Sequence, residues 1–149
     1  MKCGTCTMCC LLLGIKSVDS PPGKWCRHAE PGEGCTIYEA RPDECSSFRC
    51  AWMQMETVSD NLRPDLCKAI FEKIGNDIFF CTQHPAYGIK RVVKRQIGEF
   101  VKQGFSVVAK TAGNNHPAVI PAKGKTAKEV WQKFEAERKK INGDTLLHN

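Results

Sequence analysis

Residues 3–10 read C-G-T-C-T-M-C-C and place four cysteines, Cys3, Cys6, Cys9 and Cys10, in one short run. Thiolates crowded in this way repel one another and oxidise readily unless a positive charge holds them together. In a reducing compartment that charge usually comes from a metal ion or an iron–sulfur cluster, because disulfides are rare there. This stretch therefore predicts that metal binding organises the amino-terminal half of the fold.

Further cysteines downstream extend the ligand set. The chain has 10 cysteines in 149 residues, and the next four are Cys26, Cys35, Cys45 and Cys50. Residues 14–36 are rich in proline and glycine, so this segment is expected to need a cross-link to hold its shape. Together with the opening four, these cysteines make eight, which is enough for two four-thiolate sites.

The spacing of the opening cysteines bears on how many metals they bind. If residues 3–10 were helical, Cys3, Cys6 and Cys10 would share one face, and Cys9 would lie about 100° to one side. Two adjacent cysteines seldom bind one tetrahedral zinc, so the pair favours two neighbouring metals. Which cysteines share an ion is left open by the spacing.

Both zinc and an iron–sulfur cluster fit this ligand set. Structural zinc takes four thiolates in a tetrahedron and contributes about 10 kcal/mol or more of folding free energy at neutral pH. A [4Fe–4S] cluster also takes four cysteines, and C-x2-C-x2-C is a common spacing for it. We expect two zinc ions, because eight thiolates fill two four-thiolate shells, with a [4Fe–4S] cluster as the alternative.

The cysteine run, together with Gly34 to Trp52 (G-C-T-I-Y-E-A-R-P-D-E-C-S-S-F-R-C-A-W), resembles the CxxCxxCC (YkgJ-type) cysteine-cluster family. That family is described as a zinc- or iron-chelating domain, and the resemblance covers roughly residues 3–52. The metal ligands that it implies are Cys3, Cys6, Cys9, Cys10, Cys26, Cys35, Cys45 and Cys50. Ser46 departs from the arginine that many relatives carry.

Other polar residues near the cysteines have two possible roles each. Tyr38 and Arg41 lie between two ligands and are candidates to donate hydrogen bonds to anionic sulfurs, or else form a packed tyrosine and a surface ion pair with Glu39. His28 is a weaker candidate ligand. Cys67 and Cys81 fall on apolar segments and are expected to be small buried side chains.

Composition and charge place the chain in a broad class. No stretch approaches the 18 or so apolar residues of a membrane span, and no apolar core follows the start, so we expect a cytoplasmic protein with no membrane partner. The formal net charge is +6, and residues 84–149 carry 13 basic against 5 acidic side chains. This basic half could dock an acidic protein, whereas nucleic acid is unlikely to be the partner because no aromatic residues interleave with the charges.

The remaining sequence predicts an α+β fold, with a cysteine-rich, metal-stabilised amino-terminal half packed on a small antiparallel sheet and two amphipathic helices. Residues 1–60 are expected to form the metal-binding module and 61–149 an α+β lobe, together one compact unit. The expected elements are a helix over 41–55, a hairpin over 66–82 (with a helix over 65–74 as its competitor), a helix over 89–101, strands over 105–110 and 118–121, and a helix from the Thr126–Glu129 capping box to Gly143.

Three functional hypotheses follow. The first is a protein with two structural zinc sites and no defined cellular role. The second is an iron–sulfur protein with a redox or enzymatic role. The third is a binding module that docks an acidic protein or nucleic acid through its basic carboxy-terminal half. The sequence contains no recognisable catalytic set of residues, so enzymatic activity is left open.

Overall fold

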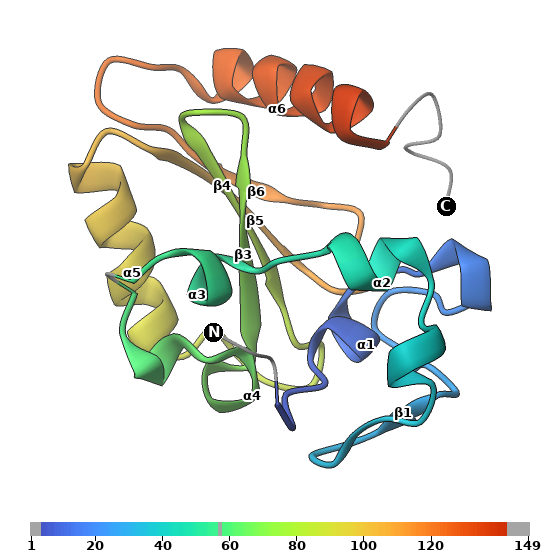
Figure 1. The fold of residues 1–149 in the computed structure, drawn as a ribbon. Coiled ribbons are helices and arrows are strands. Elements are labelled where there is room, and N and C mark those ends of the chain that lie inside the picture. Colours follow the sequence, from blue (N-terminus) through green and yellow to red (C-terminus); the bar gives the residue numbers. More distant parts are fainter. Residues whose placement is uncertain (1–3, 57, 143–149) are drawn as a thin grey trace.

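The structure is a computed structural model, and it describes residues 4–56 and 58–142. The first half of the chain holds only short elements, which lie against both faces of a central sheet (Figure 1). In chain order these are α1 (Cys9–Leu12), the 3-10 turn η1 (Lys16–Val18), β1 (Ala29–Glu30), β2 (Gly34–Cys35), η2 (Tyr38–Ala40), α2 (Asp43–Ser47), α3 (Ala51–Gln54), η3 (Asp60–Leu62) and α4 (Pro64–Cys67).

The second half holds the main sheet and the two long helices. Its elements are β3 (Ala69–Ile74), β4 (Ile78–Gln83), α5 (Arg91–Lys102), β5 (Ser106–Thr111), β6 (Ala118–Ile120) and α6 (Ala127–Asn142). The predicted hairpin is confirmed as β3 and β4, which pair antiparallel around a turn where Gly75 has a φ of 60°. The predicted α+β class is likewise confirmed.

The four-stranded sheet has the order β3-β4-β5-β6. The sequence predicted an antiparallel sheet, whereas this sheet is mixed, because β4 and β5 are parallel. β4 and β5 run parallel because α5 carries the chain back along the sheet between them, as a crossover helix must. At the end of α5, Gly104 has a φ of 89°, and the N–H of Phe105 donates to the carbonyl of Phe100. This helix ending allows the chain to turn directly into β5.

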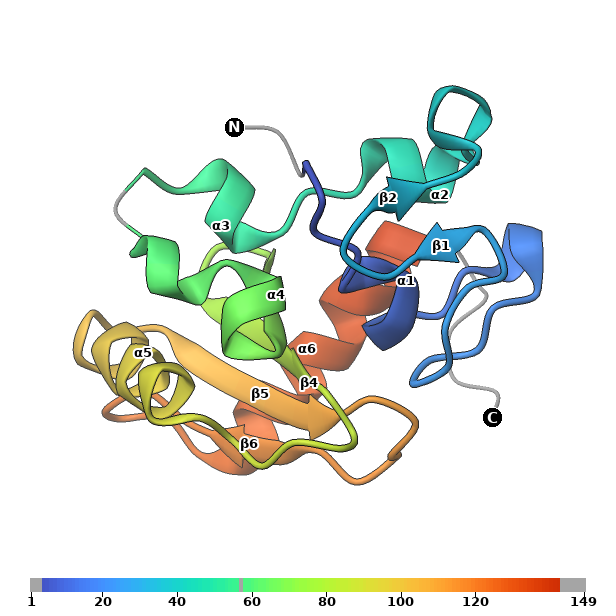
Figure 2. The same cartoon turned by 90° about the horizontal axis from the view of Figure 1, so that it is seen from below.

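Each face of the sheet is covered by different elements. One face is covered by α5 together with α3 and η3, around a core that includes Phe71, Phe79 and Val107. On the other face, α6 covers one end, where Phe134 packs on Phe80 and Val108. The amino-terminal segment covers the other end of that face, where Leu11, Leu12 and Cys50 pack on Ile70 and Ala112. Figure 2 shows α1 and α6 on the same side of the strands.

The helix α6 begins at the predicted capping box. The N–H and hydroxyl of Thr126 donate to Glu129, and the N–H of Glu129 donates to the Thr126 hydroxyl at 3.3 Å. Lys125 and Lys133 then hold the β3–β4 turn through Asp77, at 2.6 and 2.8 Å. The predicted end at Gly143 lies outside the described residues. No helix in the described part of the chain is long and apolar enough to cross a membrane.

The predicted continuous helix over 41–55 is wrong, because the chain forms α2 and α3 with an extended break between them. Phe48 has φ −65° and ψ 133° there, and its ring packs against the cluster around Leu12. The extended backbone lets Cys50 and Phe48 both reach the core, which a straight helix would not. α2 is tied to the distant turn η1 by Glu44, which accepts a hydrogen bond from the N–H of Ser17 at 3.0 Å.

Candidate metal centre

Cys9 and Cys10 begin the short helix α1, and their sulfur atoms lie 3.9 Å apart. Residues 4–8 are not helical, so the face shared by Cys6 and Cys10 in a continuous helix does not form. Zinc–sulfur bonds of about 2.3 Å at tetrahedral angles put ligand sulfurs about 3.8 Å apart. The 3.9 Å between the adjacent sulfurs is close to that separation, and it equally suits ligands of two neighbouring ions that meet at this pair.

The cysteines of the next two segments lie against this pair. The N–H of Cys26 donates to the carbonyl of Cys10 at 2.9 Å, and β1 pairs with β2 so that Ala29 stands opposite Cys35. Burial raises the pKa of Cys45, and the nearby thiols of Cys9, Cys26 and Cys35 raise it further. These cysteines thus come from separate segments but act on one another electrostatically.

A second group gathers around Cys6. Burial raises the pKa of Cys6, while the backbone N–H groups of Met8 and Asp65 approach the sulfur and oppose that shift. Cys9 also raises the pKa of Cys6, which places the two thiols near each other. Cys50 is buried in the same cluster as Cys6 and Cys9, on the far side of Ile70 from α5.

This arrangement raises the pKa of the Cys6, Cys9 and Cys45 thiols and so makes them costly to ionise. The contact with Cys10 raises the pKa of Cys9 most, and burial adds to the effect. A bound cation reverses this effect, because it is attracted to the same thiolates that repel one another. The chemistry of the donor set therefore fits a soft, positively charged group.

A single groove joins the two groups. All seven described candidate ligands line it, and they are Cys6, Cys9, Cys10, Cys26, Cys35, Cys45 and Cys50. Cys67 and Cys81 lie outside it, buried among the side chains between the sheet and α5, as predicted. Burial raises the pKa of Cys67 to about 11, so this thiol stays protonated. Among the described candidate ligands, Cys6, Cys9, Cys10, Cys26, Cys35 and Cys45 form no disulfide.

The described residues do not form a closed coordination shell by themselves. Within residues 4–56 and 58–142, no three cysteine, histidine or carboxylate side chains are arranged closely enough to hold a metal ion. Cys3, the eighth candidate ligand, lies outside the described residues. The convergence of donors fits a metal, and binding it would require the sulfur atoms to draw closer together.

The residues around the cysteines have the following placements. Arg41 stacks over the ring of Tyr38 at 3.8 Å and donates to the Tyr38 carbonyl at 2.5 Å. Both side chains line the groove, and so does His28. The sequence predicted a contact with sulfur or a surface ion pair with Glu39, whereas the structure shows this cation–π pair.

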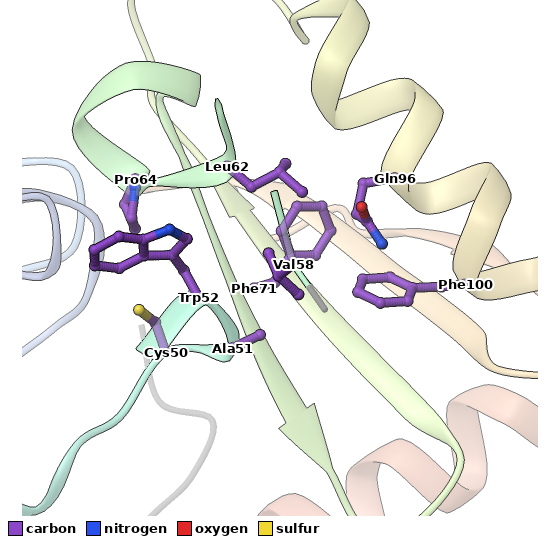
Figure 3. A pocket seen from close by; sticks show the side chains of 9 residues that line it. All are labelled: Cys50, Ala51, Trp52, Val58, Leu62, Pro64, Phe71, Gln96 and Phe100. Atoms are coloured by element: carbon purple, nitrogen blue, oxygen red, sulfur yellow. The ribbon is translucent and has the colours of Figure 1, made fainter. Parts of the chain in front are cut away.

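Sequence reasoning missed two neighbours of the centre. Asp65 supplies a backbone N–H to Cys6 from α4, and its carboxylate is held by Arg63 at 2.6 Å. Trp52 lies beside Cys50, and its indole N–H is buried without a hydrogen-bond partner among the described residues (Figure 3). It borders a cavity of about 10 Å³, about the size of one water molecule. Trp52 comes two residues after Cys50 in the sequence, and this closeness could have indicated it as a neighbour of the centre. Nothing in the sequence near the cysteines indicates Asp65.

No family model, curated protein sequence or solved structure matches this chain.

Proposed function

We propose that this chain is a metal-binding protein whose amino-terminal half is organised by two zinc ions, each bound by four cysteine thiolates. The observation that supports the proposal most is the convergence of seven cysteines, from segments far apart in sequence, on one groove. The two cysteines that the sequence pattern set apart, Cys67 and Cys81, are buried elsewhere.

The contacts favour a division of the ligands into two sets that meet at Cys9 and Cys10. Cys26, Cys35 and Cys45 belong to one set, and Cys6 and Cys50 belong to the other, which Cys3 would complete. Each set takes one cysteine of the adjacent pair. The 3.9 Å between the two adjacent sulfurs puts the two centres side by side. This division agrees with the expectation from the adjacent cysteines that two metals lie close together.

The proposed role of the metals is structural. Eight thiolates fill two tetrahedral shells and leave no open position for water or substrate, as structural zinc sites do. The segment they would cross-link has few other means of support, since α1, α2 and α3 have 4, 5 and 4 residues. Helices this short are unstable without tertiary contacts or cross-links.

Elemental analysis with an absorption spectrum tests the proposal on full-length protein purified without oxygen. The zinc proposal predicts colourless protein with about two zinc ions per chain, one for each four-thiolate shell. A brown sample that contains iron and acid-labile sulfide would contradict it and favour a [4Fe–4S] cluster on the same cysteines. Protein that folds with neither metal would contradict both.

A further inference from the structure

The groove has a second wall, opposite the cysteines, that carries charge where a sheet face would normally be apolar. On the face shared by α1 and α6, the sheet register places Glu72, Thr82 and Lys110 on neighbouring strands. The amino-terminal segment covers Ile70 at one side of them, and α6 covers Phe80 at the other. All these residues line the groove. The charged side chains therefore occupy the gap that the two covering elements leave.

The charges in this gap do not balance. Arg138 of α6 donates to Glu72 at 2.8 Å, and the side chains of the two are only 26% and 16% exposed. Burial raises the pKa of Glu72, and Arg138 opposes that shift. Lys110 is a second cation beside this pair. The carboxylate that raises the pKa of Lys110 is that of Glu72, which already forms an ion pair with Arg138. Among the described side chains of this gap, two cations and one anion leave a net charge of +1.

Lys110 itself shows the cost of this imbalance. Burial lowers the pKa of its ammonium, and the charge of Arg138 lowers it further, while Glu72 opposes both. A half-buried cation that is repelled by its neighbour gains most from an added anion. Further along α6, Glu135 and Lys139 line the same groove, and their formal charges cancel.

Aromatic and aliphatic side chains adjoin the cations. The Lys110 ammonium lies 5.7 Å from the ring centroid of Phe80, and the Arg138 guanidinium lies 5.2 Å from it. Phe80 and Phe134 pack at 5.0 Å, and Trp131 packs on Phe134 at 5.5 Å. Ile141, at the end of α6, is 58% exposed and lines the groove as well. The site thus offers one uncompensated positive charge beside an apolar wall.

We propose that this part of the groove binds a small carboxylate with an apolar body, whose carboxylate accepts hydrogen bonds from Lys110 and whose body lies against Ile141, one turn beyond Arg138 on α6. A net charge of +1 matches a monocarboxylate better than a phosphate dianion. Small-molecule sites commonly combine an apolar lining with a few polar groups that fix orientation. This proposal stands apart from the zinc proposal, since none of its residues is a candidate metal ligand.

The test uses two probes of the same shape, 2-naphthoate and the neutral 2-naphthamide, titrated by fluorescence into full-length, metal-loaded protein. We expect naphthoate to bind at least about tenfold more tightly than naphthamide, the ratio set by one charge-assisted hydrogen bond. Equal binding of the two probes, or no binding of naphthoate at millimolar concentration, would overturn the proposal.

Variants at Lys110 separate this site from a structural role. Lys110→Met and Lys110→Gln are each expected to weaken naphthoate about tenfold and to leave naphthamide unchanged, while Lys110→Arg retains binding. The matched control is Lys94→Met, on the exposed face of α5, which should change neither probe. If the Lys110 variants instead lose metal and keep naphthoate affinity, Lys110 is a counter-charge for the thiolates and the proposal is wrong.

Discussion

The backbone N–H of Cys26 donates to the carbonyl oxygen of Cys10 across 2.9 Å. Together with the hydrogen bond from the N–H of Gly23 to the carbonyl of Leu11 at 2.7 Å, this hydrogen bond holds the proline- and glycine-rich loop against α1 and sets two candidate ligands beside each other. Because the main chain makes the contact, it survives replacement of either side chain. Variants of these cysteines therefore test ligation separately from the path of the chain.

Cys10→Ser is expected to lose bound zinc, because a serine hydroxyl is a poor zinc ligand and one shell would be left with three thiolates. The control is Cys81→Ala, which removes a fully buried thiol between the sheet and α5. It should cost about 1 kcal/mol of stability and leave the zinc content unchanged. The measurement is zinc per chain by elemental analysis. Equal zinc in both variants would show that Cys10 is not a ligand.

Metal removal is expected to loosen only the amino-terminal half. The core between the sheet and α5 contains none of the candidate ligands, so it should persist when a strong chelator removes the metal. Hydrogen exchange of backbone amides would then accelerate in residues 4–55 and stay slow in β4 and β5. Uniform acceleration across the chain would mean that the metal supports the whole fold, and no acceleration would mean that it supports none.

Arg138→Met is expected to destabilise the protein by about 3 kcal/mol, because it leaves the carboxylate of Glu72 buried without its partner. The double variant with Glu72→Met as well should recover most of that loss, since both charges are then absent. Urea unfolding of the wild type, each single variant and the double variant provides the free energies. A double variant no more stable than Arg138→Met would contradict this account.

Much of the second half could be predicted from the sequence because its elements are long and local. The β3–β4 hairpin, α5 with its glycine ending and the Thr126 capping box all follow from patterns within a few residues. The parallel pairing of β4 and β5 could not be predicted in this way, because it depends on where α5 returns the chain to the sheet. Sheet pairing of this kind is a tertiary property.

The candidate site shows the same limit. Its cysteines could be found by counting and spacing, but the break between α2 and α3 could not, because tertiary packing of Phe48 overrides the helical periodicity around it. The N–H of Asp65 beside Cys6 comes from α4, which no pattern near the cysteines could indicate. Contacts between segments distant in sequence decide which donors meet.

His84 offers a test of the electrostatics away from the metal. Burial lowers the pKa of His84 below 6.5, and the ammonium of Lys68 lowers it further. Its contribution to stability is therefore full above pH 6.5 and falls as the pH drops below that value, because the unfolded chain takes up the proton more readily. In Lys68→Met, the NMR titration midpoint of His84 should move up toward 6.5, and the resonances of the other histidines should be unaffected. An unchanged midpoint would show that Lys68 does not contribute to the lowered pKa of His84.

The central claim is that the amino-terminal cysteines bind zinc through sulfur alone, and X-ray absorption at the zinc edge tests it most directly. On full-length protein loaded with zinc, the account predicts four sulfur neighbours per zinc at about 2.3 Å and no nitrogen or oxygen in the first shell. A shell that contains nitrogen or oxygen at about 2.0–2.1 Å would contradict saturated thiolate ligation and, with it, a purely structural role for the metal.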